Sequence, residues 1–376
     1  MTAPIELVEQ RHVILCCGTG GVGKTTTAAT FAIEGARRGR NAVVVTIDPA
    51  KRLANTLGLE HLSNSAHEIA RERWDPDGDA VRGGGRLHAL MLDTETTFDQ
   101  LVQTYARNDE QATGILSNRF YRNIAGALSG TQEYMAMEKL YELHDQGGFD
   151  LIVVDTPPTR HALDFLDAPR RLTRLLDNRV FRMLMVPTRG VVRVGGVAAA
   201  AFLKTISRVV GSEAVDDLVA FFRAFEGMEA GFRERAAQVT QLLAADETAF
   251  VLVTSPRRDA VEEAEYFAGR LADGEFSVDA LVVNRVHERY SDIEPEALRD
   301  RARELAGRRS EASNRLAAQY ANLADLEEVA VRERAELAGL EDRIGGASVV
   351  HVPELGHDVH DFAALRAVGN HLMGAE

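Results

Sequence analysis

The residues best suited to chemistry lie in one short stretch near the N-terminus, CCGTGGVGKTTTAA at residues 16–29. Gly18, Gly23, Lys24 and Thr25 follow the spacing G-x-x-x-x-G-K-[ST]. A loop of this kind turns backbone N–H groups toward an anion at the start of a helix. We therefore expect Lys24 to reach the β- and γ-phosphates of a nucleotide and the Thr25 hydroxyl to ligate Mg²⁺.

Two aspartates end other apolar runs and could complete this site. Asp155 closes FDLIVVD, and Asp48 closes VVVTID just before Pro49. Beside a phosphate loop, a carboxylate at the end of a buried strand can hold the Mg²⁺ shell, and we assign that role to Asp155. Asp48 could position an attacking water, because ligands bind at this edge of such a sheet. The plainer alternatives are a turn cap for Asp155 and a helix cap for Asp48.

Most of these residues end or follow short, β-branched runs that are apolar throughout rather than alternating. Strands covered on both faces have this pattern, and helical patterns lie between most of the runs. The sequence therefore predicts an α/β fold with a mostly parallel, doubly wound sheet, as one domain over residues 1–376. The runs occupy residues 12–17, 41–48, 86–93, 149–156, 248–255, 278–284 and 347–353.

Three regions interrupt this pattern. Residues 59–86 are polar and predict a loop. Residues 168–245 are long, helical and apolar, and predict an inserted helical subdomain. Residues 288–345 are charged and alanine-rich, and predict a helical hairpin or short coiled coil, either a solvated arm or an interaction arm.

The composition of the chain bears on its binding partners and its location. The net charge is −14, which argues against a nucleic-acid footprint because such surfaces are normally basic. The N-terminus lacks the pattern of a signal peptide, and no apolar run approaches the length that predicts an integral membrane segment. Cys16 and Cys17 are adjacent in sequence and cannot form a disulfide framework, so a cytoplasmic location is expected.

Several segments together resemble the arsenite-pump ATPase family, which includes the ATPase that targets tail-anchored membrane proteins. GTGGVGKTT, TIDPAKRLANTLG and DTPPTRHALDFL are similar to its phosphate loop and its two switch segments. LVVNRV resembles the strand with the family's adenine-contacting asparagine, here Asn284, and HVPELGHDVHDFAAL resembles its adenine loop, beginning near Pro353. This family belongs to the deviant phosphate-loop class, with nitrogenase iron protein and the Min and Par ATPases.

The resemblance implies ATP or ADP with Mg²⁺ as cofactors. It implies that Asp48 orients the hydrolytic water, that Lys24 is the second catalytic residue, and that Thr25 and Asp155 serve the metal. His161 matches the histidine of the second switch segment, where it has either a nucleotide-sensing or a structural role. The residues implied to hold the nucleotide are Gly20, Gly21, Val22, Gly23, Lys24, Thr25, Thr26, Asn284 and Pro353.

One departure from the family concerns Thr19. The family works as a dimer or tandem pseudodimer in which a lysine at this position reaches the partner's phosphates, and a threonine carries no such charge. The chain either forms a heterodimer with a lysine-bearing paralogue, or uses another cation, or binds nucleotide with little hydrolysis. We favour the heterodimer over a homodimer because the phosphate, water and Mg²⁺ residues are retained. The alternative cations are Lys51, Arg52 and Arg160.

A second departure concerns cargo. The chain lacks the separated cysteines with which the arsenite-pump ATPase binds metalloid, and it lacks the C-x-x-C clasp of the targeting ATPase. Residues 168–245 could instead hold a hydrophobic protein client, or form a subdomain core or a partner interface. The apolar side chains considered for a client surface are Met183, Leu184, Met185, Val191, Val192, Phe202, Leu203, Phe221, Phe222 and Phe225.

The sequence as a whole thus predicts a Mg²⁺-dependent ATPase that acts as a dimeric switch coupled to a protein partner or client. The alternative is a nucleotide-binding regulatory subunit with little hydrolysis of its own.

Overall fold

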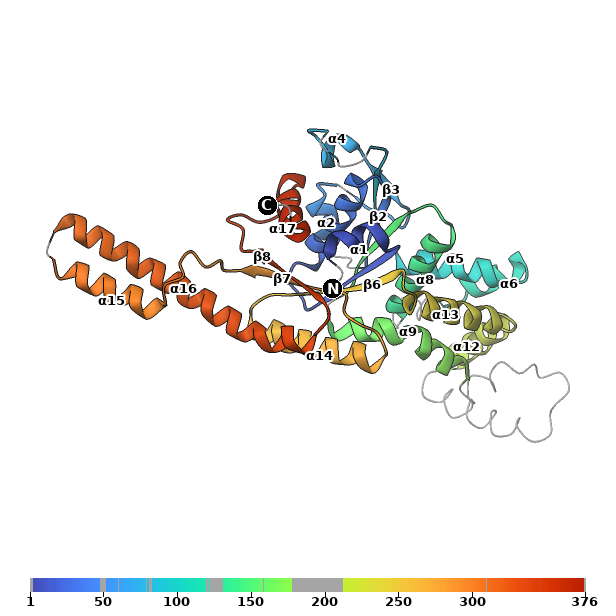
Figure 1. Cartoon of the computed structure of the whole chain (residues 1–376). Coiled ribbons are helices and arrows are strands. Elements are labelled where there is room, and N and C mark those ends of the chain that lie inside the picture. Colours follow the sequence, from blue (N-terminus) through green and yellow to red (C-terminus); the bar gives the residue numbers. More distant parts are fainter. Residues whose placement is uncertain are drawn as a thin grey trace.

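The structure is a computed structural model of the chain, and it describes residues 3–47, 52–59, 61–78, 80, 83–119, 121, 131–157, 159–177, 212–308 and 310–374. Its centre is an eight-stranded sheet in the order β3-β4-β2-β5-β1-β6-β7-β8 (Figure 1). Within the described sheet every pairing is parallel apart from β3 with β4. The strands are β1 (Val13–Gly18), β2 (Asn41–Thr46), β3 (His67–Ile69), β4 (Arg86–Met91), β5 (Leu151–Asp155), β6 (Thr248–Thr254), β7 (Ala280–Val286) and β8 (Ser348–Pro353).

Helices cover both faces of the sheet, and the α/β, mostly parallel fold expected from the sequence is confirmed. The helices are α1 (Pro4–Gln10), α2 (Lys24–Arg37), α3 (Arg52–Thr56), α4 (Arg71–Trp74), α5 (Thr94–Tyr105), α6 (Asp109–Leu116), α8 (Thr131–Asp145), α9 (Thr159–Asp177), α12 (Ser212–Ala224), α13 (Glu229–Leu243), α14 (Arg258–Asp273), α15 (Pro295–Ala306), α16 (Glu311–Arg343) and α17 (Phe362–Met373).

The central strand β1 shows why its sequence is apolar throughout. Its residues are all buried, and they alternate between two hydrophobic clusters on opposite faces of the sheet. Ile14 and Cys16 belong to the cluster that contains residues of α2 and α17. Leu15 and Cys17 belong to the cluster that contains residues of α8 and α14. A strand with a core on each face has no polar side, which is the pattern of a doubly wound sheet.

The expectation of a loop over residues 59–86 was wrong in part. This region contains β3, which pairs antiparallel with β4 at the edge of the sheet, and α4. Trp74 of α4 is 3% exposed, and its Nε1 donates to the carbonyl of Ile69 at 3.1 Å. Both elements are short and are held by a few buried contacts, so neither leaves a periodic apolar pattern in the sequence.

A third hydrophobic cluster lies beyond the sheet, among α5, α6, α8, α9, α12 and α13 (Figure 1). Phe221 and Phe225 are 9% and 5% exposed, and Phe225 lies 5.1 Å from Phe232 between ring centroids. These two phenylalanines therefore belong to a core rather than to an open surface for a client. The residues from Met183 to Leu203 considered for that surface, and the side chain of Phe222, lie outside the described residues.

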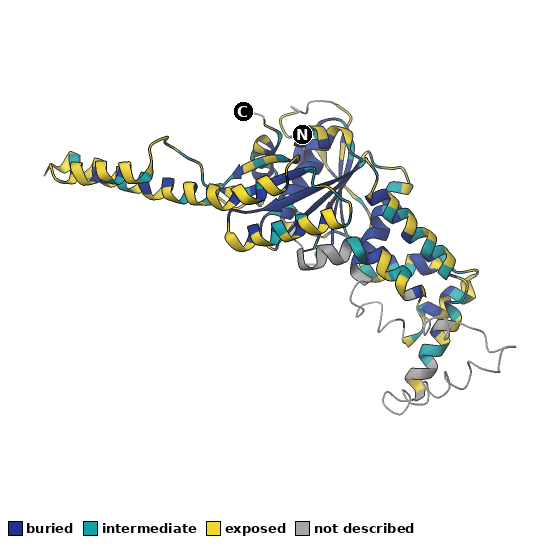
Figure 2. Ribbon diagram, turned by 60° about the horizontal axis from the view of Figure 1, so that its bottom comes forward, coloured by how far each residue is buried: buried dark blue, intermediate teal, exposed yellow. Residues whose placement is uncertain are grey.

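The helices α15 and α16 extend away from the sheet between β7 and β8 (Figures 1 and 2). Most of their surface is exposed in Figure 2, but the C-terminal part of α16 buries Leu337 and Leu340. Glu327 of α16 is fully buried, and it accepts hydrogen bonds from Arg289 Nε at 2.9 Å and from the Tyr290 backbone N–H at 2.6 Å. Through these bonds the Glu327 carboxylate holds the segment that follows β7 against the middle of α16.

In the described ranges, no helix combines the length and the apolarity that crossing a bilayer requires. The C-terminal helix α17 instead buries its apolar stripe against α2 and β8, through Leu365, Val368 and Leu372.

Candidate functional site: a nucleotide pocket at the carboxyl edge of the sheet

The phosphate loop joins β1 to α2, and its glycines occupy positions that other residues would strain. A Cβ atom on Gly18 would lie 2.0 Å from the carbonyl oxygen of Val253 in β6. Gly21 and Gly23 have φ angles of 81° and 99°, in the left-handed region that favours glycine. Within the described residues, no side chain caps the N-terminus of α2 at Gly23. The start of a helix without a side-chain cap is a typical place for a nucleotide phosphate.

Lys24 lies inside this loop. Its side chain is 7% exposed, and its Nζ donates to the backbone carbonyl of Thr19 at 2.7 Å. A buried ammonium beside the glycine loop adds positive charge where phosphates would lie. Thr19 takes part in this contact only through its backbone carbonyl, which any residue could supply. The contact therefore does not explain why position 19 is a threonine.

Asp155 is the acidic centre of the site. It ends β5, which lies between β1 and β2, and it is 1% exposed. Its Oδ2 accepts from Thr25 Oγ1 at 2.7 Å and from Thr46 Oγ1 at 3.1 Å. Carboxylate and hydroxyl oxygens are ligands that Mg²⁺ takes in proteins, so Thr25 and Asp155 fit the ion that the resemblance implies.

Thr46 was not singled out from the sequence. It ends β2 opposite Asp155, and Cys16 of β1 lies opposite Asp155 on the other side. The hydroxyl of Thr46 orients the carboxylate from the side away from the phosphate loop. Only the order and register of the strands reveal this contact, although a polar residue at the end of an apolar run is a weak signal for it.

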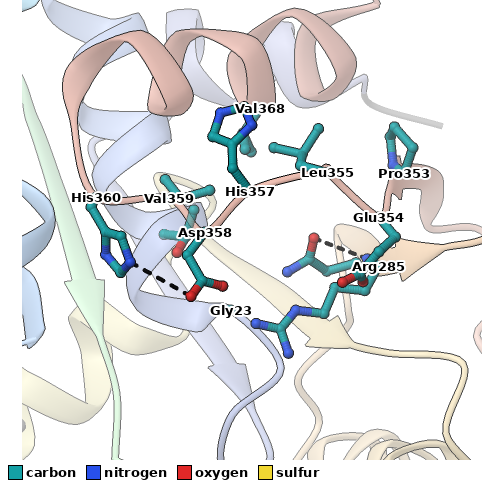
Figure 3. A pocket seen from close by; sticks show the side chains of 12 residues that line it. Gly23, Arg285, Pro353, Glu354, Leu355, His357, Asp358, Val359, His360 and Val368 are labelled. Carbon is teal, nitrogen blue, oxygen red and sulfur yellow. Dashed lines mark hydrogen bonds and ion pairs between the residues drawn. The ribbon is translucent and has the colours of Figure 1, made fainter.

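The other end of the site is a pocket of about 260 Å³ between the start of α2, the end of β7, the segment after β8 and α17. It brings together Gly23, Thr26, Asn284 and Pro353, four of the residues expected to hold the nucleotide. Figure 3 shows the side chains around this pocket. Its lining is Gly23, Thr26, Asn284, Arg285, Pro353, Glu354, Leu355, His357, Asp358, Val359, His360 and Val368.

Asn284 connects the two ends. Its Nδ2 donates to the carbonyl of Val22 in the phosphate loop at 2.9 Å, and its Oδ1 accepts from the Arg285 N–H at 3.0 Å. A Cβ atom on Gly23 would lie 2.2 Å from Nδ2 of Asn284. The loop and the end of β7 are therefore in direct contact, and glycine at position 23 is what allows it.

Arg285 was missed in the sequence. It has a φ angle of 62°, unusual for a residue with a Cβ atom, at an irregularity in the β7–β8 pairing between Asn284 and Val286. In Figure 3 its guanidinium extends from β7 toward the side of the pocket where Gly23 and Asp358 lie. A backbone outlier beside a pocket is a recognised mark of functional sites. The available signal was a pair of polar residues, Asn284 and Arg285, inside an apolar run.

The remaining candidates fall partly outside the described residues. These are Asp48 and Lys51 as a whole, and the side chains of Arg52, Arg160 and His161. Ile47, directly before Asp48, is 2% exposed, and its N–H donates to the carbonyl of Asp155 at 3.4 Å. The role of Asp48 with the hydrolytic water stays a prediction.

The comparisons with known proteins agree with this geometry. The sequence profile of the anion-transporting ATPase family matches residues 11–342. ATPase get3 of Pyrenophora tritici-repentis is 25% identical over 272 residues, which cover 72% of this chain and 72% of that protein. ATPase GET3 of Phaeosphaeria nodorum is 26% identical over 272 residues, covering 72% of this chain and 74% of that protein. ATPase GET3 of Malassezia globosa is 29% identical over 173 residues, or 46% of this chain and 47% of that protein.

Proposed function

The chain belongs to the anion-transporting ATPase family, and on that basis we propose that it binds ATP with Mg²⁺ and hydrolyses it as one half of a dimeric switch. The observation that carries the proposal is the convergence of Lys24, Thr25 and Asp155 at the carboxyl ends of β1 and β5. Phosphoryl transfer depends chiefly on positioned positive charge, and these residues supply a place for it.

Each residue has a separate task in this proposal. The backbone N–H groups at the start of α2 and the Lys24 ammonium hold the phosphates. Thr25 and Asp155 would hold Mg²⁺, which supplies positive charge to the phosphate oxygens. Asp48, by its resemblance to the family's first switch segment, orients the water that attacks the γ-phosphorus. The bond from the γ-phosphorus to the bridging oxygen breaks, and ADP and inorganic phosphate leave.

Asn284 and the segment from Pro353 would hold the base, at the far end of the same pocket. The Asn284 contact to Val22 supports this assignment, because it joins the end of β7 directly to the phosphate loop.

We further propose that the partner is a paralogous chain with a lysine in place of Thr19. The retained Lys24, Thr25 and Asp155 argue that this site still acts on ATP, while Thr19 cannot deliver charge to a neighbouring site. A cationic group supplied in trans to phosphoryl transfer is worth roughly 10³-fold or more in rate. The partner's lysine would then serve this chain's site.

The first test is the mass of the native complex, purified from the source cells through a tag on this chain with Mg²⁺ and ADP present. A second chain of similar size bearing the lysine-containing loop supports the heterodimer. A homodimer or a monomer contradicts it, and leaves the missing charge to Lys51, Arg52 or Arg160.

A substitution gives an independent test. In the isolated chain, Thr19→Lys should raise ATP turnover at least tenfold if two copies can pair, because each site then receives a charge from the other. Thr19→Met is the matched control, since it adds length without charge and should leave turnover unchanged. Equal turnover in both variants would show that the missing charge is not what limits the isolated chain.

The alternative function is a regulatory subunit that binds nucleotide without turning it over, which the absence of a lysine at position 19 also favours. Asp48→Asn in the complex separates the two proposals. A large loss of turnover per complex supports catalysis in this chain, and an unchanged rate supports the regulatory subunit.

Coupling to a hydrophobic client is a further part of the proposal, and it rests on the family resemblance and on the apolar character of residues 168–245. Phe221 and Phe225 are buried, so they do not contribute a binding face in this structure. Photo-crosslinking to an apolar helical peptide in the ATP and ADP states tests this part. A lack of crosslinking in every nucleotide state contradicts it.

A further inference from the structure

Two histidines and a glutamate meet at the amino edge of the sheet, opposite to the nucleotide pocket. His12 directly precedes β1, Glu247 directly precedes β6, and His144 lies in the last turn of α8. The backbone N–H of His12 donates to the carbonyl of Glu247 at 2.9 Å. One potential ligand atom from each of the three residues lies within 4.8 Å of the others.

The contacts within this group leave one nitrogen unexplained. His144 Nε2 lies 3.1 Å from Glu247 Oε1, and the two imidazole rings lie 4.8 Å apart between centroids. Nε2 of His12 is buried, and none of the described residues forms a hydrogen bond with it. A buried polar atom without a partner is uncommon in folded proteins and requires an explanation.

The other nitrogen of His12 is already in use. A hydrogen bond to the backbone of Phe149 acts to raise the pKa of the ring, and because Nε2 has no partner among the described residues, we assign this bond to Nδ1. With the proton assigned to Nδ1, the lone pair is on Nε2. Metal-binding histidines are typically oriented in this way, by a backbone carbonyl on the nitrogen that does not bind the metal. Burial and the neighbouring His144 both lower the pKa of His12.

We propose that His12 Nε2, His144 Nε2 and the Glu247 carboxylate form a binding site for a divalent transition metal, with Zn²⁺ as the best match. Two imidazoles and one carboxylate are a common protein ligand set for zinc, with a fourth position for water. Bond lengths of about 2.0–2.2 Å to zinc require these ligand atoms to approach one another to roughly 3.3 Å. The Glu247 side chain is 43% exposed and can make that adjustment, and it opens the fourth position to solvent.

One neighbouring charge opposes this proposal. Arg40 lies close enough to His12 to lower the pKa of its ring. Its guanidinium is occupied, since Nη1 donates to the carbonyls of Val8 at 2.5 Å and Arg11 at 2.6 Å, and the Asp150 carboxylate offsets its charge. The positive charge of Arg40 near the proposed metal ligands is therefore offset by Asp150.

A metal at this place would join the end of α8 to the starts of two central strands. It would act independently of the nucleotide, because the 6 residues of β1 separate the two edges by about 20 Å. The proposal therefore does not depend on ATP hydrolysis by this chain.

The experiment measures Zn²⁺ binding to the full chain, with its purification tag removed and its metals stripped by a chelator. Excess Mg²⁺ and ADP fill the phosphate loop, and zinc is titrated in competition with a chromophoric chelator. We expect one zinc per chain, with an affinity that falls at least tenfold in His144→Asn and in Glu247→Gln. The control is His351→Asn, because His351 also contacts a glutamate, Glu341 at 3.1 Å, but has no third ligand in the described residues.

The melting temperature is a second measurement, and it shows whether a variant loses zinc affinity because it no longer folds. Zinc should raise the melting temperature of the wild-type chain and not that of Glu247→Gln, whose melting temperature without zinc should equal the wild-type value. Cobalt in place of zinc should give the intense visible absorption of a four-coordinate site in the wild type alone. Absence of stoichiometric zinc binding, or an equal loss of affinity in His351→Asn, overturns the proposal.

Discussion

The two ends of the proposed nucleotide pocket, a phosphate end and a base end, are built in different ways. The phosphate end lies on the central strands β1 and β5, and its polar side chains are buried, with Lys24 7% and Asp155 1% exposed. The base end lies on β7 and β8 at the edge of the sheet, where the side chains of Asp358 and His360 are 80% and 75% exposed. The phosphate end is held by strands with a hydrophobic core on both faces of the sheet. The base end is held by Asn284 and by the irregular pairing of β7 with β8. We therefore expect substitutions at the phosphate end to change rate, and substitutions at the base end to change affinity.

The largest effect is expected at Lys24. Lys24→Met keeps the aliphatic stem of the side chain and removes its charge, so turnover in the native complex should fall by about 10²-fold or more. Steady-state release of phosphate by the purified complex measures it. A rate within twofold of the wild type would show that this ammonium does not serve the reaction, and would remove the distinction between the two ends.

The next effect concerns the metal ligands. Asp155→Asn removes the buried carboxylate charge, and the Mg²⁺ concentration that supports half-maximal turnover should rise by about 10-fold or more. Thr46→Val serves as a graded control, because it removes only the hydroxyl that donates to Asp155 and should cost about 1 kcal/mol of stability. Equal Mg²⁺ requirements in wild type and Asp155→Asn would argue against a metal role for this residue.

A third prediction tests the junction between the ends. Gly23→Ala places a methyl group against Asn284 and forces alanine into a left-handed conformation, so stability should fall by about 1–3 kcal/mol. Asn284→Ala alone should weaken ATP binding about tenfold, or about 1.4 kcal/mol, without lowering the turnover at saturation.

The double variant makes this test sharper. Combining Gly23→Ala with Asn284→Ala should recover part of the stability, since the clash is gone and only the backbone strain remains. Chemical unfolding and nucleotide titration measure the two quantities. Strictly additive losses of stability would mean that the contact between the loop and β7 is not formed in solution.

The smallest effect is expected at Arg285. Arg285→Gly relieves its positive φ angle and should stabilise the chain by about 1 kcal/mol, while ATP affinity falls several-fold because the pocket loses a cation. Glu275→Gly is a matched control, because Glu275 has a φ angle of 64° and follows α14 away from the pocket. It should give the same stabilisation with unchanged affinity. The same affinity in both variants would show that the outlier at Arg285 is not functional.

The sequence predicted the sheet well, because its strands depend on local pattern, and the glycine-rich loop singled out from the sequence lies between β1 and α2. The β-branched runs identify seven of the eight strands, and the spacing of Gly18, Gly23 and Lys24 is local as well. The contacts of Thr46 and Arg285 were not predicted, because they depend on which strands are neighbours and in which register. His12 and Glu247 meet only because Val13 of β1 lies opposite Thr248 of β6. No pattern within one segment contains that information.

The buried pair of cysteines in β1 has a practical consequence. Burial raises the pKa of Cys16 well above its usual range and that of Cys17 to about 12, so neither forms the thiolate that reacts with labelling reagents. They are the only cysteines in the sequence. A cysteine introduced at an exposed position, such as Leu316 on α16, will therefore be the sole reactive thiol in an otherwise native chain. Fluorophores or spin labels attached there can test the proposed opening and closing of a complex without first removing cysteines from the core.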